Sequence, residues 1–430
     1  MSTSSENNLG CSVRLRRAER LQIRWRDVCL DEMVAADHPV RAIWQYIQSL
    51  DLSPLHEKIL AVEGHVGRDA TDPAILMALW MYAITDGISS ARKIATKTTE
   101  DWIYAWICGD VSVNYHMVSD FRTEHGAFLE RLLVDSIAAL MHQQVVTLNT
   151  VAQDGMRVRA NAGASSFRRE KSLEACRDTA AEQLQKLDEE SDSESKQDND
   201  KRRQASKKRA ATERSERVAA ALENLKELQQ QKEKRQKGSG ENARSSTTDP
   251  DARVMKMADG GHRPAMNVQF ASDADSRMIV GVEVSNNGSD AGQMSPMHRK
   301  LQEQYGGTPE NYLVDGGFPT IDEVTKLEQE KSRVIGPIPR ARETLRKGKD
   351  PHARGAKDTD EMARFRERMA TDEAKAMLKL RPSVAEFSNA TCRNNGLHQF
   401  PVRGLRKAKV IALWHALVHN FMRMRHLGLA

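Results

Sequence analysis

The chain has 430 residues, of which 29% are charged, and its formal net charge is +5. This length allows two or three domains, at least one of which can bury a sizeable core. The longest uncharged apolar run, residues 75–84, is about half as long as a membrane-spanning helix requires. The polar start also lacks the apolar stretch of a signal peptide. We therefore expect a multidomain soluble protein without a membrane segment.

The five cysteines are widely separated and form no CxxC pair. They are Cys11, Cys29, Cys108, Cys176 and Cys392. This spacing argues against zinc clips and a disulfide framework, and it favours free thiols in a reducing cytoplasm.

Positive charge is concentrated near the two ends of the chain. Near the start, six arginines face a single acid, Glu19, and after Glu386 there is no Asp or Glu at all. The cations are Arg14, Arg16, Arg17, Arg20, Arg24 and Arg26, and then Arg393, Arg403, Arg406, Lys407, Lys409, Arg423 and Arg425. Either cluster alone fits a solvated helix face, but two together suit contact with a polyanion such as DNA.

Residues 27–145 have apolar positions at helical spacing, which predicts an all-helical domain. Asp72 before Pro73 is a typical N-cap followed by proline at the first helical position. Later, a short turn at residues 111–114 separates two predicted helices, the second of which carries Arg122. That order permits a DNA-reading helix-turn-helix, although many helical domains contain such a pair.

From residue 147 onward, strand and helix patterns alternate. We expect a strand (148–158), a charged helical hairpin or coiled coil (164–246) with its apex at 189–203, a β-hairpin (266–284), a helix (292–305), a strand ending at Asp315, a helix (321–331), a strand (333–338) and a basic loop (340–360). This order predicts an α/β layer with a mixed five-stranded sheet.

Asp154 lies in the first of these strands, and Asp315 ends a later one. Neighbouring strands end at the same edge of a sheet, so both carboxylates could face one crevice. Hard divalent cations take oxygen ligands, and two ions can stabilise the attacking and leaving oxygens of a phosphoryl displacement. Each Asp alone also suits a turn cap; the pair favours a site, with Gly316 and Gly317 leaving room for a ligand.

Glu386 is the candidate third acid. Pro382 suits the first turn of a helix that ends near Gly396, which would place Glu386 in the second turn and Arg393 on its face. Arg381 precedes this helix, so two guanidinium groups could hold a phosphate beside the acid. A plain salt-bridged surface helix would look similar, and Glu367, Asp372 and Glu373 compete for the role.

These residues together resemble the DDE transposases of bacterial insertion sequences, from about residue 39 to 424. The resemblance rests on several short motifs. They are Asp72-Pro73, Gly87-Ile88-Ser89-Ser90-Ala91-Arg92, Val118-Ser119-Asp120-Phe121-Arg122, Gln153-Asp154-Gly155 with Arg157, Thr248-Asp249-Pro250-Asp251, Asn267-Val268-Gln269, Leu313-Val314-Asp315-Gly316-Gly317-Phe318, Arg381 with Glu386 and Arg393, Phe400-Pro401-Val402-Arg403-Gly404-Leu405, and His419-Asn420.

The resemblance implies an all-α DNA-binding domain (27–145) and an RNase H-like DDE catalytic domain (147–430) interrupted by the hairpin insertion (164–246). It implies that Asp154, Asp315 and Glu386 hold two Mg²⁺ ions, which Mn²⁺ can replace. The activity implied is cleavage at the terminal inverted repeats of the element and joining of the 3′ ends to target DNA.

The resemblance also implies where DNA and partner chains bind. Arg381 and Arg393 would position backbone phosphates, with Arg92, Arg122, Arg403 and Lys407 as further candidate DNA contacts. The same resemblance implies double-stranded DNA as a partner and a possible homodimer. It also implies a location in the bacterial cytoplasm at the nucleoid, with no membrane partner.

Two positions depart from the family signature: Leu378 stands where a tyrosine is usual, and Arg393 where a lysine is usual. Leu378 and the long insertion leave open a catalytically inert DNA-binding repressor of related elements. An RNase H-like nuclease that cuts without joining would use the same acids. The HxxxH spacing of His415 and His419 follows an apolar run, so we interpret it as helix packing and not as a metal pair.

Overall fold

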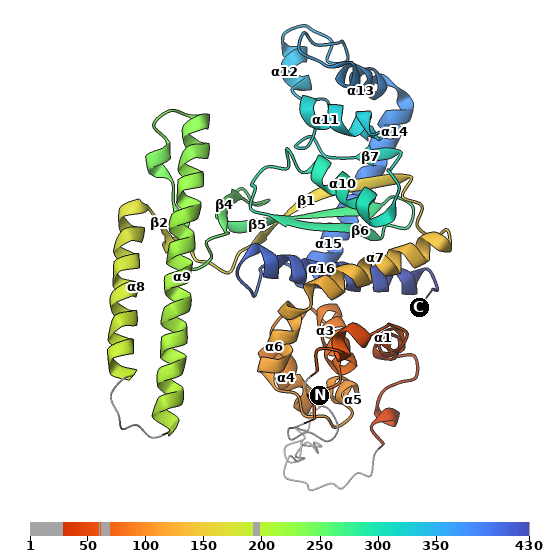
Figure 1. Ribbon diagram of the computed structural model, residues 1–430. Helices are drawn as coiled ribbons and strands as arrows, with labels where there is room; N and C mark the ends of the chain where they lie inside the picture. Colours follow the sequence, from red (N-terminus) through yellow and green to blue (C-terminus); the bar gives the residue numbers. More distant parts are fainter. Residues whose placement is uncertain (1–28, 60, 62–68, 192–197, 430) are drawn as a thin grey trace, which may run out of the picture.

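The computed structural model describes residues 29–59, 61, 69–191 and 198–429. The arginine-rich cluster near the start, and residues 192–197 at the expected hairpin apex, lie outside the described residues. The described chain forms an N-terminal group of helices, a mixed sheet covered by helices, and a long helical pair to one side of the sheet (Figure 1).

The N-terminal region is helical, as expected. Its helices are α1 (Pro39–Gln48), α2 (Ser53–His56), α3 (Pro73–Thr85), α4 (Ala91–Glu100), α5 (Trp102–Cys108), α6 (Tyr115–Glu124) and α7 (Gly126–His142). Asp72 accepts a hydrogen bond from the Ala74 amide at 2.8 Å and caps α3 as predicted. Gly87 follows α3 with a φ of 66°, and the Ser90 side chain caps α4.

The main sheet is mixed, also as expected. Its strands are β1 (Thr150–Arg159), β4 (Arg253–Lys256), β5 (His262–Asp273), β6 (Ile279–Ser285), β7 (Asn311–Leu313) and β8 (Arg333–Ile335). The order is β4-β5-β1-β7-β8, with β6 also paired to β5. β5 runs antiparallel to β1, whereas β7 runs parallel to both β1 and β8. A small separate pair consists of β2 (Phe167–Arg168) and β3 (Ser245–Ser246).

Two details differ from the sequence-based expectation. Within the described residues the main sheet has six strands and not five, because β4 pairs with the first part of β5. β4 has only four residues, too few to show a clear two-residue alternation, so no strand was expected between residues 246 and 266. The expected basic loop 340–360 likewise contains a short helix, α12 (Ala341–Arg346).

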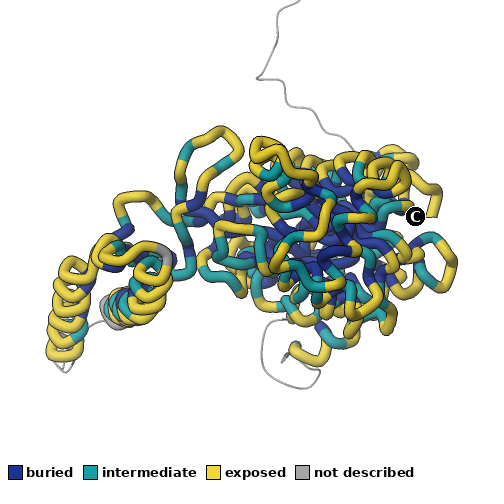
Figure 2. The backbone as a smooth tube through the Cα atoms, turned by 90° about the horizontal axis from the view of Figure 1, so that it is seen from above, coloured by how far each residue is buried: buried dark blue, intermediate teal, exposed yellow. Residues whose placement is uncertain are grey.

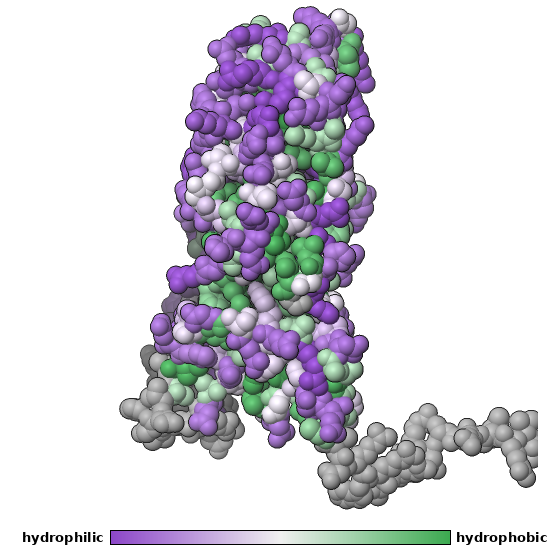
Figure 3. Space-filling model, turned by 90° about the vertical axis from the view of Figure 1, so that its right-hand side faces the viewer, coloured by the Kyte–Doolittle hydropathy of each residue, from purple (hydrophilic) through white to green (hydrophobic). Residues whose placement is uncertain are grey.

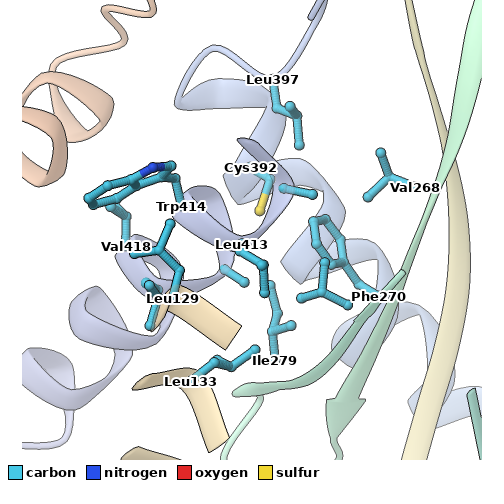
Figure 4. Close-up of a cluster of buried hydrophobic side chains, with 14 of the residues drawn as sticks. Leu129, Leu133, Val268, Phe270, Ile279, Cys392, Leu397, Leu413, Trp414 and Val418 are labelled. Carbon is cyan, nitrogen blue, oxygen red and sulfur yellow. The ribbon is translucent and has the colours of Figure 1, made fainter. Parts of the chain in front are cut away.

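The remaining helices cover the sheet. They are α10 (Met294–Tyr305), α11 (Ile321–Gln329), α13 (Asp360–Ala370), α14 (Asp372–Arg381), α15 (Phe387–Asn394) and α16 (Leu405–His426). α16 is buried along most of its length between the sheet and the N-terminal helices (Figure 1). Figure 4 shows the resulting core, where Trp414 and Val418 lie near Leu129, and Leu413 lies near Phe270 and Ile279. The helical region and the sheet therefore share one hydrophobic core.

Polar contacts fix both ends of α16. The Asp249 and Asp251 carboxylates accept hydrogen bonds from the Gly404 and Leu405 amides, at 3.2 and 3.0 Å, and so satisfy the start of the helix. Near its other end, the Asn420 amide pairs with the backbone of Ile279 through two bonds of 2.8 Å. These contacts hold α16 in register with the edge strand β6.

The predicted helical insertion is present as α8 (Glu170–Ser191) and α9 (Asp198–Arg235). Polar contacts between the two helices run in antiparallel order: Gln229 to Glu170 at 3.0 Å, Arg214 to Gln183 at 3.3 Å, and Lys208 to Asp188 at 2.6 Å. A small core that includes Leu173 and Leu225 lies at its base. Figure 2 shows that most of the pair is exposed, in contrast to the buried interior of the sheet region.

The surface is mixed in polarity. In the view of Figure 3, hydrophilic side chains cover most of the upper part of the molecule, where α11 to α14 lie, and hydrophobic patches are scattered below. Among the described residues, none of the helices combines the length and apolar character needed to cross a membrane.

The two histidines of α16 give a prediction about pH. His415 and His419 are buried, and the His419 Nε2 atom donates to the Arg277 carbonyl at 2.8 Å. Burial lowers the pKa of His415 to about 3 and that of His419 to about 4. In the unfolded chain both titrate near about 6.5, so protons bind the unfolded state more strongly. The contribution of these two neutral histidines to stability is therefore complete above about pH 6.5, and it is lost as the pH falls toward 4.

We expect His415→Leu to flatten this loss by up to about 1.4 kcal/mol per pH unit between pH 6 and about 4. Urea unfolding measured across that pH range tests the expectation, with His142→Leu, at the exposed end of α7, as the matched control. An unchanged slope in His415→Leu, together with a changed slope in the control, would contradict it.

Candidate active site

Parallel pairing of β1 and β7 brings Asp154 and Asp315 together. Ala152 of β1 pairs with Leu313 of β7, and each acid lies two residues beyond its member of that pair. Because the strands run in the same direction, both carboxylates reach the same edge of the sheet. The two acids therefore lie at one edge of the sheet, as expected, and both contact Arg381.

Glu386 reaches this edge through an irregular helical turn. The helix does not begin at Pro382, as expected; α14 begins at Asp372, and a π-helical turn, η4 (Pro382–Glu386), joins it to α15. Proline has no N–H to continue the regular pattern, and a wider turn accommodates this. Residues five apart point in different directions on an α-helix, whereas a π turn brings them closer. Arg381 and Glu386 consequently face the same point.

The guanidinium of Arg381 contacts all three acids. Its Nη2 atom lies 3.1 Å from Asp154 Oδ1 and 3.9 Å from Asp315 Oδ2, and its Nη1 atom lies 3.6 Å from Glu386 Oε1. Three side chains that are 161 and 71 positions apart in sequence thus converge on one cation. One guanidinium cannot neutralise three carboxylates, so the cluster keeps an excess of negative charge.

Asp154 is the most enclosed of the three acids, with its side chain 17% exposed, against 61% for Asp315 and 63% for Glu386. Burial raises the pKa of the Asp154 carboxyl, and the Arg381 charge acts in the opposite direction. Besides Arg381, the Gly155 amide donates to Asp154 at 3.0 Å and the Asn389 side-chain amide at 2.9 Å. These partners offset much of the cost of enclosing a charged group.

The donor atoms of this cluster suit a hard divalent cation, which takes carboxylate and amide oxygens. Within the described residues, no three His, Cys, Asp or Glu side chains lie close enough together to share one ion, because the Arg381 guanidinium lies between these acids. The buried Arg381 Nε and Asn389 Oδ1 atoms have no hydrogen-bond partner in the described part of the chain. A free donor and a free acceptor therefore remain at the site for a ligand.

A buried polar network lies beside Asp154 and was not predicted. The Asp290 carboxylate accepts hydrogen bonds from Asn267 and Gln269, both at 2.8 Å, and pairs with Arg157 at 2.8 Å. Asn267 and Gln269 were visible as polar residues in an apolar strand, but Asp290 lies in a turn-like sequence that gave no signal. Asn389 was missed too, since it has no distinctive spacing from the acids.

The glycines at the site differ in how closely neighbouring atoms approach them. A Cβ atom at Gly316 or Gly317 would meet its neighbours only at ordinary contact distances, 3.5 and 3.7 Å, so packing does not require glycine there. A Cβ atom at Gly155 would instead overlap the Asp290 carboxylate and the Gln269 amide. Gly155 is therefore the glycine on which the close approach of β1 to this network depends.

The predicted DNA-binding residues do not lie together. Arg393 makes no ion pair with the acids and instead lines a groove with Gly155 and Arg157, so the acid is not flanked by two guanidinium groups as expected. Arg122 is buried: its Nη1 atom donates to the Ser89 carbonyl at 2.9 Å, and its guanidinium stacks on Trp80. Burial lowers the pKa of Arg122 to about 10. This position suits packing of the helical region and argues against a direct DNA contact.

The other predicted contacts are exposed. Arg92 on α4 lies over the Tyr115 ring, with its guanidinium carbon 5.0 Å from the ring centroid. Arg403 lines a small pocket beside the base of the hairpin, with Arg214 and Arg217, and Lys407 is exposed on the first turn of α16. These three cations are free to meet a ligand from outside the fold.

Comparison with known protein families gives two matches. Residues 28–124 match a family model described as a transposase domain (DUF772), and residues 233–421 match one described as a transposase DDE domain. Asp315 and Glu386 lie within the second match, whereas Asp154 lies between the two matches. Comparisons with curated proteins and with solved structures returned no match.

The mixed sheet with its clustered acids, preceded by a helical region, agrees with these two matches. The chain belongs to the DDE transposases of insertion elements. Membership implies an RNase H-like fold for the sheet region, DNA as the partner and general use of divalent metal ions.

The Gly155 contact gives a testable prediction. Gly155→Ala should lower the free energy of unfolding by about 1–3 kcal/mol, because the new methyl group must displace the Asp290 network. Gly163→Ala is the matched control, since a Cβ atom there meets its nearest neighbour at 3.6 Å. Equal free energies of unfolding for the two variants in chemical denaturation would contradict the prediction. They would show that the Asp290 network can rearrange around the new methyl group without a loss of stability.

Proposed function

We propose that this transposase cuts and joins DNA with Asp154, Asp315 and Glu386 as its catalytic acids. The observation that carries the proposal is the contact of all three carboxylates with the one guanidinium of Arg381. Like charges repel, so a fold gathers three acids at a single point only where cations hold them. A salt-bridged surface helix would not recruit acids from β1 and the end of β7.

We propose that the three carboxylates, with Asn389 Oδ1 beside them, hold two divalent cations, Mg²⁺ or Mn²⁺. When bound, such ions activate the attacking oxygen and stabilise the leaving oxygen of an in-line displacement. Cleavage exchanges one bond for another: a water oxygen attacks phosphorus, and the bond to the 3′ oxygen of the element breaks. In joining, that 3′ hydroxyl attacks a target phosphodiester, and the target 3′ oxygen leaves.

Arg381 has a second role in this proposal. Its Nε atom is buried without a partner in the described part of the chain, so the guanidinium has a donor to offer a DNA phosphate. A phosphate bound to Arg381 would compete with the three acids for the guanidinium, and the acids would then be available to hold cations. Asn389 holds Asp154 in place through its 2.9 Å hydrogen bond while this exchange occurs.

The division of labour follows the domain boundaries inferred from sequence. Residues 27–145 would recognise the terminal inverted repeats, with Arg92 exposed for contact, and residues 147–430 would carry out the chemistry. The insertion at 164–246 stands clear of the sheet, and Arg403 and Lys407 lie on the C-terminal part. Two copies would act on paired ends as a homodimer, with the insertion as the contact between them.

Replacement of an acid tests the proposal directly. Asp154→Ala should reduce Mg²⁺-dependent cleavage of DNA carrying the terminal repeats by about a thousandfold or more, because several kcal/mol of transition-state stabilisation are lost. Binding of the ends, measured without metal, should remain. Retained cleavage by Asp154→Ala would refute the assignment.

Two controls make the test specific. Glu367 is exposed on α13 and competed with Glu386 in the sequence, so Glu367→Gln should keep activity while Glu386→Gln loses it. A strand-transfer product from the unmodified protein excludes a nuclease that only cuts. No cleavage by the unmodified protein, with end binding intact, would favour an inert repressor.

A further inference from the structure

A groove of about 750 Å³ opens next to the acids. Gly155 forms part of its wall, and this residue directly follows Asp154 on β1. Arg393, also in the wall, lies on α15, which carries the Asn389 side chain that contacts Asp154. The groove thus adjoins the candidate active site through β1 and α15, although none of the three acids lines it.

The topology of the sheet explains why the groove exists. β7 pairs with only the first part of β1, residues 150–152, and then the chain turns away at Asp315. On that side of β1, the described residues supply only an isolated bridge from Arg159 to Gln399. On the other side, the turn that joins β4 to β5 extends the wall.

The wall is strongly cationic. It includes the side chains of Arg157, Arg159, Lys256, Arg263 and Arg393, against one acid, Asp259. We call this feature the basic groove. Five cations around a single acid give the groove a local excess of positive charge, although the whole chain is only mildly basic.

The cations of the basic groove fall into two groups. Arg157 pairs with Asp290 at 2.8 Å, and Arg263 pairs with Asp259 at 2.7 Å, so both are held in place by the fold. Arg159, Lys256 and Arg393 are exposed, and their side chains make no ion pair or hydrogen bond with any residue that the structure describes. Cations that the fold leaves without counter-charges are available to an external anion.

The shape and position of the groove select among anions. A small anion would occupy one cation, whereas these three lie on separate elements, on β1, the end of β4 and α15. A chain of regularly spaced phosphates can reach all of them at once. Because Gly155 in its wall directly follows Asp154, a DNA strand held in the groove could extend to the three acids.

We propose that the basic groove binds the phosphodiester backbone of the DNA strand that passes Asp154, Asp315 and Glu386. The inference rests on the proposed function and extends it by naming the surface that holds the strand next to the scissile bond. Arg159 and Lys256 are the new contacts, and they bind phosphate without reading sequence. Arg157 and Arg263 already have internal ion pairs and are not needed as contacts.

The test measures DNA binding without metal, so its readout does not depend on cleavage. Arg159→Gln, Lys256→Gln and the double variant, in the full-length chain, are titrated against a fluorescent duplex carrying one terminal repeat at several salt concentrations. Each lost phosphate contact should lower the slope of log affinity against log salt by about one, so the double variant should lose about two. Its affinity should fall by about tenfold or more at low salt.

Arg299→Gln is the matched control, because Arg299 is an exposed arginine on α10, outside both the groove and the helical region, and has no ion pair among the described residues. It should keep the affinity and salt slope of the unmodified protein. Thermal melting of all variants checks that they remain folded, and the exposure of Arg159 and Lys256 predicts that they do.

Placement along the strand is tested by neutral methylphosphonates introduced one at a time near the cleaved bond. A neutral phosphate in the groove should weaken binding by the unmodified protein and leave binding by the double variant unchanged. An unaltered salt slope in the double variant, or equal loss in Arg299→Gln, would overturn the groove proposal. A groove that instead holds only RNA would show loss of RNA binding with DNA binding intact, which also overturns it.

Failure of this proposal is separable from failure of the catalytic one. If Asp154→Ala abolishes cleavage while the groove variants bind DNA normally, the catalytic assignment stands and the groove assignment falls. If the groove variants lose binding while Asp154→Ala still cuts, the reverse holds.

Discussion

The enclosed Asp154 carboxylate and the Arg381 guanidinium form the interaction on which the site depends. A carboxylate this little exposed remains charged only beside a cation and hydrogen-bond donors, and the fold supplies Arg381, Gly155 and Asn389. The same guanidinium reaches Asp315 and Glu386, which are more exposed. The Asp154–Arg381 pair therefore also holds Asp315 and Glu386 close together. Without it, these two exposed acids would be free to move apart in solvent.

The rest of the fold brings these side chains to one place. Parallel pairing of β1 with β7 sets two acids at the same edge, and the π turn η4 directs Glu386 toward them from the helical layer. α16 lies behind this layer, held at its start by Asp249 and near its other end by the hydrogen bonds of its Asn420 side chain to Ile279 of β6. Since α16 also packs on the N-terminal helices, the region matched to a DUF772 transposase domain and the sheet form one continuous core.

The sequence predicted the parts of this arrangement that follow from regular structure. Asp154 and Asp315 were identifiable because each lies in or at the end of a predicted strand. When two such strands pair in parallel, their carboxyl ends lie side by side. Glu386 was identified, but its turn was not, because a π turn has no periodic signature and Pro382 resembled a helix start. Asp290 and Asn389 were missed because their place in the site depends on hydrogen bonds to residues far away in the sequence. Their local spacing in the chain gives no sign of those contacts. Arg122 was misjudged because a cation stacked on Trp80 and an exposed one look alike in sequence.

The most direct measurement is Mn²⁺ affinity by calorimetry, without DNA, for the unmodified protein, Arg381→Gln and the double variant Asp154→Asn/Arg381→Gln. If the guanidinium and the metal ions share the three carboxylates, removing its charge at 3–4 Å should tighten Mn²⁺ binding by about tenfold or more. The double variant should then lose that gain. Unchanged or weaker Mn²⁺ binding by Arg381→Gln would contradict the account. It would mean that the guanidinium and the metal ions do not compete for the three carboxylates.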